Sequence, residues 1–104
     1  MNLGQLIDRL TQLPKDMIVH LGGIHSYRGY HDEISIAGVR RPVPQALAEC
    51  KKANGKAFRG WKGGMFVMNL NTPIWLSSAG ECSNRYLTAI NDDGSIEVGY
   101  VERD

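Results

Sequence analysis

A stripe of aliphatic side chains near the start of the chain sets the first constraint on its fold. The members of the stripe recur at the spacing of one helix face: Leu3, Leu6, Ile7, Leu10 and Leu13. Asn2 precedes the stripe as an N-cap, and Pro14 follows it as a stop. Such an amphipathic helix is stable only when its apolar face packs on another element. The rest of the chain must therefore supply a second apolar layer.

Short apolar runs separated by turn residues predict that this second layer is a β-sheet. Residues 17–21 and 34–37 are expected to be antiparallel neighbours, joined over residues 22–33 by a long loop or a distorted hairpin end. Five further strands are expected in the remaining half: 56–61, 65–68, 74–77, 85–90 and 96–101. Tight hairpins are expected at residues 62–64 and 91–94, and Pro73 is expected to open a strand or lie at a sheet edge.

A second helix is predicted over residues 45–53. Pro44 suits its first turn, and Asn54-Gly55 suits a left-handed exit. Its apolar face is small, so we expect it to pack lightly across the sheet. Together the elements predict an α+β fold in which two helices pack on a mainly antiparallel sheet. We expect one compact domain over residues 1–104, because a chain of this length builds one core.

Charge and hydropathy narrow the classes of partner and compartment. Twelve Lys and Arg against eleven Asp and Glu give a net charge of +1, which argues against a protein that coats extended nucleic acid. No run approaches the roughly 20 apolar residues of a membrane span, and Asp8 and Arg9 interrupt the only N-terminal apolar stretch. We therefore expect a cytoplasmic protein without membrane contact. Cys50, in the second helix, and Cys82, in a loop, are expected to be free thiols.

The first aromatic-basic segment, residues 22–33, has the composition of a binding site. It places two histidines, two tyrosines, an arginine and two carboxylates between apolar runs, which a simple turn does not require. The Arg28 fork suits phosphate or carboxylate, and Tyr27 and Tyr30 offer faces on which a base can stack. In the alternative interpretation the tyrosines complete the core edge, and Arg28 pairs with Asp32 or Glu33.

The second aromatic-basic segment, residues 58–66, combines aromatic and basic residues with three glycines. Peptide N–H groups at Gly63 and Gly64 can approach an anion closely, with Arg59 or Lys62 supplying charge and Trp61 a ring. The segment matches neither the phosphate-loop nor the dinucleotide fingerprint, and a glycine-rich hairpin with a core tryptophan is the alternative. The two segments together predict a two-sided pocket for an anionic ligand with a flat ring.

Histidines allow two further interpretations of the first segment. His25 and His31 are candidates for a general acid and base acting on a phosphodiester. A metal site built from His20, His25, His31 and Asp32 is a weaker alternative. We expect no metal and no cofactor, and we expect binding without chemistry rather than catalysis.

Both segments resemble motifs of small proteins encoded in tailed-phage genomes. The similarity covers about residues 3 to 80 and includes His25-Ser26-Tyr27-Arg28-Gly29-Tyr30 and the run from Phe58 to Phe66. Residues 59–66 are also similar to a basic-Gly-Trp-x-Gly-x-Gly-Met-Phe element of the anti-Thoeris sponge proteins. These resemblances imply a phage protein that sequesters a nucleotide immune signal in the host cytoplasm.

The resulting hypothesis is an anti-defence sponge for a cyclic dinucleotide or a cyclic ADP-ribose type of nucleotide. Its expected ligand-binding residues are Ser26, Tyr27, Arg28, Tyr30, Arg59, Trp61, Lys62, Gly63 and Gly64. We expect a homo-oligomer, because so short a chain has little room for a deep pocket within one protomer. One alternative is a phosphodiesterase-like enzyme that degrades the nucleotide, and another is an inhibitor that binds a host protein.

Overall fold

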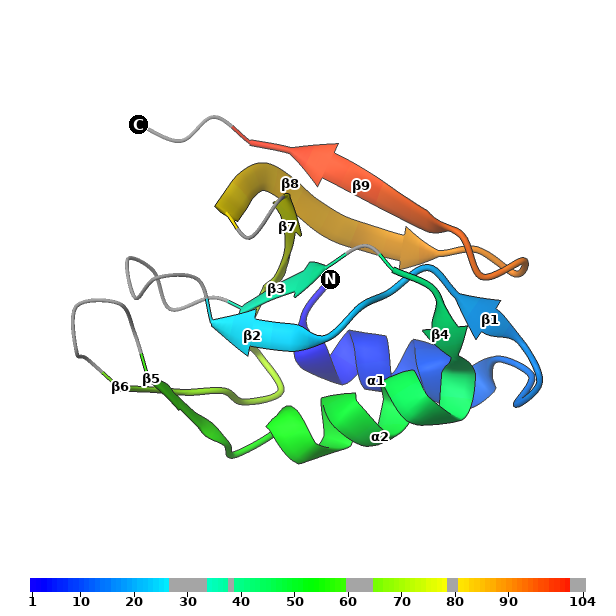
Figure 1. Ribbon diagram of the computed structural model, residues 1–104, viewed down its shortest axis with the longest axis horizontal. Helices are drawn as coiled ribbons and strands as arrows, with labels where there is room; N and C mark the ends of the chain where they lie inside the picture. The colour runs from blue at the N-terminus through cyan, green and yellow to red at the C-terminus, as the bar shows by residue number, and fades with distance from the viewer. Residues whose placement is uncertain (27–33, 38, 60–64, 79–80, 102–104) are drawn as a thin grey trace.

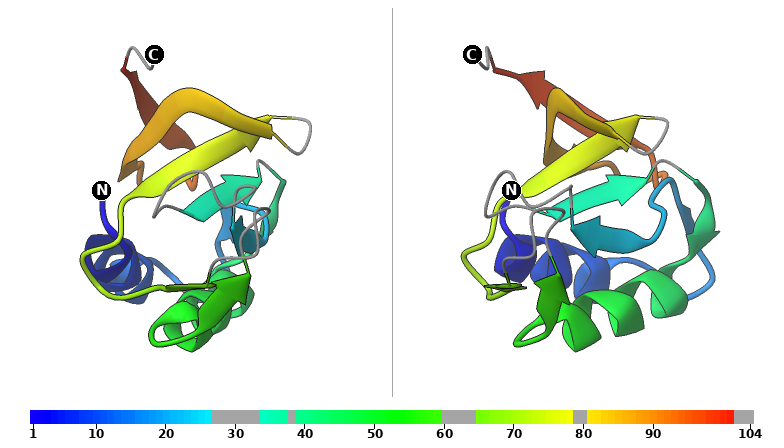
Figure 2. Two further views of the ribbon diagram at one scale, coloured as in Figure 1. Left: turned by 90° about the vertical axis from the view of Figure 1, so that its left-hand side faces the viewer. Right: turned by 60° about the vertical axis from the view of Figure 1, so that its left-hand side comes forward.

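The computed structural model describes residues 1–26, 34–37, 39–59, 65–78 and 81–101, and the structural statements below concern these residues. For residues 25, 26, 34–37, 59, 66, 77, 78 and 81–84 the description covers the backbone. Within this part of the chain, helices α1 (Leu3–Gln12) and α2 (Val43–Ala53) pack against each other on one side of a five-stranded sheet (Figures 1 and 2). The predicted α+β fold is confirmed.

The main sheet is mixed rather than wholly antiparallel. Its order is β2-β3-β7-β8-β9, with β3 and β7 parallel and the other neighbours antiparallel. The strands are β2 (Ile24–Ser26), β3 (Ile34–Ala37), β7 (Ile74–Ser78), β8 (Glu81–Ile90) and β9 (Ile96–Tyr100). Two short antiparallel pairs flank this sheet: β1 (Ile18–Val19) with β4 (Arg41–Pro42), and β5 (Ala57–Arg59) with β6 (Met65–Val67).

Helix α1 forms as its sequence predicts. The Asn2 side chain accepts the Gln5 N–H at 2.8 Å, and the Gln5 side chain accepts the Asn2 N–H at 2.9 Å, so two N–H groups at the helix start are satisfied reciprocally. Leu3, Leu6 and Leu10 are buried in the core. The Met1 amino group also donates to the Leu87 carbonyl at 2.7 Å, which ties the helix start to β8.

Helix α2 packs more deeply than its small apolar face predicts. It begins at Val43 rather than at residue 45, and it buries four small or medium side chains: Val43, Ala46, Cys50 and Ala53. Small residues allow the close approach to α1 seen in Figure 2. The helix ends where expected, because Gly55 takes a positive φ of 83° that glycine adopts without strain.

The predicted pairing of residues 17–21 with residues 34–37 is wrong. Strand β1 is only two residues long and pairs with β4, whereas β3 pairs with β2, which lies inside the expected loop. The chain leaves β1 early because the His20 N–H donates to the Gly94 carbonyl at 3.0 Å. Cys82 lies in β8 and not in a loop. The remaining expected strands are present, with bounds that differ by a few residues.

Candidate functional site

The two aromatic-basic segments start and end at one end of the molecule. Strand β2 lies within the first segment and β5 overlaps the start of the second, and these two strands contact each other. Ser26 faces Ile34 across the first pair of strands, and Arg59 faces Met65 across the second. Figure 1 shows the four strand ends together on its left-hand side. The fold therefore anchors both segments, about 30 residues apart in sequence, beside each other.

A hollow of about 140 Å³ lies between β2, β5 and the last turn of α2. Its lining consists of Ile24, Glu49, Lys52, Ala53, Lys56 and Phe58. The volume is below the range of roughly 300–1,000 Å³ typical of pockets that enclose a small molecule. The described residues thus form a small recess, to which the two aromatic-basic segments contribute Ile24 and Phe58.

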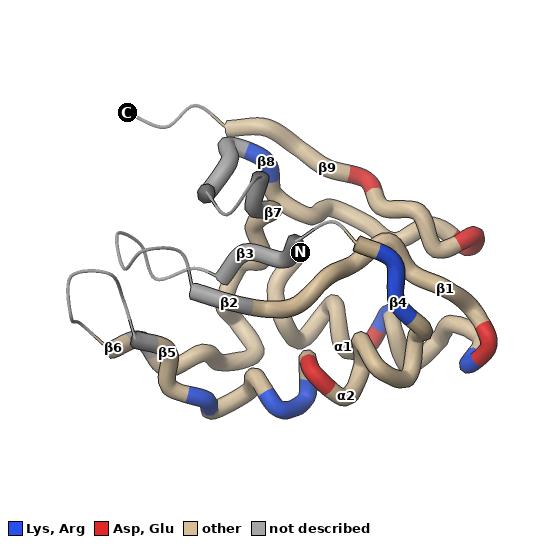
Figure 3. Tube along the Cα trace, viewed as in Figure 1, with Lys and Arg blue, Asp and Glu red and all other residues tan. Residues whose placement is uncertain are grey.

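Positive charge dominates this hollow. Lys52 and Lys56 are exposed, and the Lys56 Nζ lies 5.1 Å from the centre of the Phe58 ring. The acidic member, Glu49, is paired with Arg41. The four charged side chains therefore sum to +2. Figure 3 shows the basic residues at the end of α2 and just before β5.

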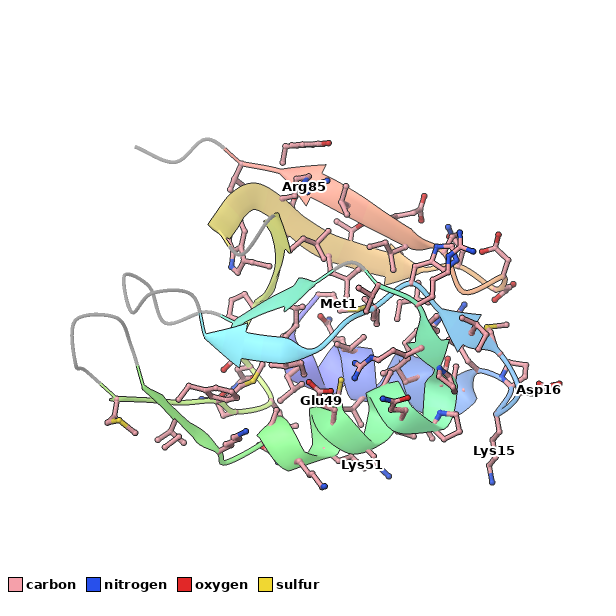
Figure 4. All side chains as sticks on the ribbon, viewed as in Figure 1. Met1, Lys15, Asp16, Glu49, Lys51 and Arg85 are labelled. Atoms are coloured by element: carbon pink, nitrogen blue, oxygen red, sulfur yellow. The ribbon has the colours of Figure 1, made fainter. Side chains whose placement is uncertain are left out.

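An ion-pair network fixes the wall of the hollow that β2 provides. Glu49 accepts hydrogen bonds from the Ile24 N–H and from Arg41. Arg41 also donates to the carbonyls of Leu21 at 3.0 Å and Gly22 at 2.6 Å. One guanidinium thus holds the chain that enters β2 against α2. In Figure 4 Glu49 points toward β2, whereas Lys51 points away from the sheet.

The network keeps Glu49 ionised. Burial alone disfavours the carboxylate, but the hydrogen bonds from Ile24 and Arg41 and the charges of Arg41 and Lys56 outweigh it, so the pKa of Glu49 lies below its ordinary value. Because Glu49 is paired with Arg41, it offsets the charge of the two lysines only in part. The hollow is suited to an anion rather than a cation.

Three of the predicted site residues fall on described backbone. His25 and Ser26 belong to β2, and Arg59 ends β5. The other predicted ligand-binding or catalytic positions lie outside the described residues: Tyr27, Arg28, Tyr30, His31, Trp61, Lys62, Gly63 and Gly64. The structural observation that bears on the expected two-sided pocket is therefore the contact between β2 and β5.

Sequence reasoning missed Lys52, Lys56, Arg41 and Glu49. The lysine in the last turn of α2 has an ordinary explanation, since it complements the helix dipole. The signal for Lys56 was its position directly after Asn54-Gly55. The Gly55 N–H donates to the Met68 carbonyl at 2.7 Å and the Lys56 N–H to the Ala53 carbonyl at 3.0 Å, which turns the chain back so that Lys56 flanks the hollow.

Other chemistries find little support in the described part of the chain. No group of three or more His, Cys, Asp or Glu residues there is arranged to hold a metal ion. Burial raises the pKa of the Cys50 thiol to about 12, so this cysteine is a poor nucleophile. No helix in the described ranges is long and apolar enough to cross a membrane. Comparison with family models, curated proteins and solved structures gave no match to this chain.

Proposed function

We propose that the protein binds and sequesters an intact nucleotide immune signal, of the cyclic dinucleotide or cyclic ADP-ribose class, in the host cytoplasm. The observation that carries the proposal is the contact between β2 and β5, which anchors the two aromatic-basic segments beside a hollow lined by two exposed lysines. Phosphate and a purine ring need such a combination of cations and aromatic faces.

Each segment has a role in this proposal. Tyr27, Tyr30 and Trp61 stack the base, while Arg28, Arg59, Lys62 and the Gly63-Gly64 amides hold the phosphates. Ser26 supplies a hydroxyl at the start of the first segment. Lys52 and Lys56 extend the positive field along α2 and β5 and attract the anion before it is bound.

A second protomer belongs to the proposal, because the hollow in the described part of one copy, about 140 Å³, is smaller than the pockets that enclose a small molecule. Ligand sites often form where subunits meet, and a homo-oligomer can enclose a ligand that one chain only touches. Sequestration requires slow release, which a ligand enclosed between subunits would provide.

Native mass spectrometry tests the proposal directly. The purified protein is measured alone and after incubation with cyclic dinucleotides, cyclic ADP-ribose isomers and related adenosine nucleotides. A mass increment of one intact nucleotide per protomer or per interface is the expected result. A linear product that accumulates beyond one equivalent would instead support an enzyme using His25 and His31. No increment with any compound would contradict the proposal and favour a host protein as the partner.

A matched pair of variants separates binding from folding. Arg28→Ala is expected to abolish the increment while the melting temperature stays within about 2 °C, because in this proposal the guanidinium holds the ligand and not the fold. Arg40→Ala removes the same charge at an exposed position outside both segments and should leave binding intact. A collapsed fold in Arg28→Ala would indicate that the arginine has a structural role.

A further inference from the structure

The outer edge of β9 is an unprotected strand edge. β9 is the last strand in the order β2-β3-β7-β8-β9, so one side of its backbone has no strand partner among the described residues. Figure 1 shows it along the upper margin of the molecule. Exposed edges are normally blunted by charged side chains, lysine above all, by proline or by a bulge. β9 has neither lysine nor proline; its one charged residue is Glu97, and the irregular register opposite it falls in β8.

Apolar surface accumulates along the same edge. Tyr100, the last residue of β9, is 72 % exposed and Val101, which follows it, is 38 % exposed, although Ile96 and Val98 of the same strand pack against the core. An exposed tyrosine beside a strand edge that has no strand partner among the described residues is a combination that strand addition satisfies. The occupant that this edge requires is therefore an extended strand with an apolar face.

Tyr86 extends across the edge strand above Gly99. These residues face each other across β8 and β9. A Cβ placed on Gly99 would lie 2.4 Å from the Tyr86 Cζ and 2.6 Å from its hydroxyl oxygen, so the ring covers the glycine. Trp75 braces the ring from β7 in an edge-to-face contact with centroids 5.6 Å apart. The Tyr86 hydroxyl is thus held near the free edge of the sheet.

We propose that β9 pairs antiparallel with β9 of a second copy, about a two-fold axis at Val98. In this register Glu97 of each copy lies opposite Gly99 of the other, where the Tyr86 hydroxyl can donate to its carboxylate. Tyr100 of each copy lies opposite Ile96 of the other, an aromatic pair with a β-branched residue that stabilises sheets. The two main sheets become one continuous sheet of ten strands.

The composition of β9 favours this axis and this occupant. An axis at Glu97 would set two carboxylates directly opposite each other, which is unfavourable. The axis at Val98, the midpoint of the strand, pairs every residue from Ile96 to Tyr100. It also places the Tyr86 hydroxyl of each copy, which lies over Gly99, beside Glu97 of the other copy. β9 itself is such a partner strand. It places a carboxylate opposite Gly99 and an aromatic ring opposite Ile96. The inference is independent of the proposed nucleotide function.

Solution measurements of the full-length chain without nucleotide test the dimer. Sedimentation and light scattering over an about hundredfold dilution series are expected to show a monomer–dimer equilibrium. Tyr86→Phe keeps the ring and removes the hydroxyl, and Glu97→Gln removes the charge. Tyr86→Phe loses two charge-assisted hydrogen bonds per dimer and Glu97→Gln leaves two weaker, neutral ones, so the first should weaken dimerisation about 100-fold and the second about tenfold. Asp8→Asn, on exposed α1 surface, is the matched control and should change nothing.

Cysteine cross-linking tests the register in a Cys82→Ser background. Residues opposite each other in an antiparallel pair have Cα atoms about 4.5–5.5 Å apart, within disulfide reach. Val98→Cys should therefore form a covalent dimer under mild oxidation, and Glu97→Cys should not, because the two introduced thiols lie two residues apart. A monomer at every concentration overturns the proposal. A dimer that resists Tyr86→Phe and Glu97→Gln, or that cross-links through Glu97→Cys instead, overturns it as well.

Discussion

At Gly94 the backbone combines a positive φ of 89° with a contact that leaves no room for a side chain. A Cβ there would lie 2.0 Å from the Ile18 carbonyl oxygen, which is backbone and cannot move aside freely. The Gly94 carbonyl also accepts the His20 N–H, so this turn joins β1 to the β8–β9 hairpin. Gly94→Ala should lower the free energy of unfolding by about 3 kcal/mol or more, measured by urea titration.

Gly55 provides the matched control for that prediction. Its φ of 83° is nearly the same, but no atom lies within 4 Å of a Cβ built on it. Gly55→Ala should therefore cost only the backbone strain, about 1 kcal/mol. Equal losses for the two variants would mean that the contact with Ile18 does not constrain the native turn.

The Cys50 thiol should be unreactive toward thiol reagents in the folded protein. Its side chain is buried and its pKa is raised to about 12, so almost no thiolate forms near neutral pH. In a Cys82→Ser variant, a thiol reagent at pH 7.5 should label Cys50 only at the rate at which α2 opens, and rapidly in denaturant. Fast labelling under native conditions would contradict the packing of α2 against α1.

At the scale of elements, the Arg41–Glu49 pair joins α2 to the start of β2. The pKa of Glu49 is lower in the folded protein than its ordinary value of 4.5. Its contribution to stability is therefore fully present above pH 4.5 and is lost as the pH falls through the folded pKa. Glu49→Gln should destabilise the protein by about 1–2 kcal/mol at pH 7, because the pair is only partly buried.

The pH dependence of this difference is the measurement that decides the prediction. Urea titrations of wild type and Glu49→Gln should differ most at neutral pH and converge as the pH falls through the folded pKa of Glu49. A constant gap at all pH values would show that charge on Glu49 does not stabilise the fold. Arg41→Lys adds a second readout, since an ammonium cannot bind the carboxylate and the carbonyls of Leu21 and Gly22 with the same fork.

Elements that depend on nearby residues could be predicted from the sequence, and pairings between distant segments could not. The capping box of Asn2, the turn at Gly94 and the strand that follows Pro73 are each encoded within a few residues. The parallel pairing of β3 with β7 joins segments 40 residues apart. The two-residue β1 is held to β4 by contacts that leave no periodic signal. Register of this kind is set by tertiary contacts.

At the scale of the whole molecule, one part of the candidate site could be predicted from the sequence and another part could not. Its aromatic and basic residues could be recognised by composition, because Arg28 or Trp61 has no simple role in a turn. The hollow could not be recognised, since it joins the end of α2, the start of β2 and the middle of β5. Lys52 and Lys56 become neighbours of Ile24 only after the chain folds, and no short pattern in the sequence records that proximity.

The two lysines of the hollow give the prediction that tests the site as a unit. Lys52→Gln and Lys56→Gln should each weaken nucleotide binding about tenfold and reduce its salt dependence, measured by calorimetry at two ionic strengths. Both residues are exposed, so unfolding should change by less than about 1 kcal/mol.

Lys51→Gln is the control because it removes the same charge from the same turn of α2. Lys51 does not line the hollow and points away from the sheet (Figure 4). The substitution changes the net charge from +1 to 0, as each test variant does. It also removes a positive charge from the last turn of α2, where that charge interacts favourably with the helix dipole. If Lys51→Gln weakens binding as much as Lys52→Gln, the nucleotide responds to overall charge, and the hollow between α2 and β5 is not part of its site.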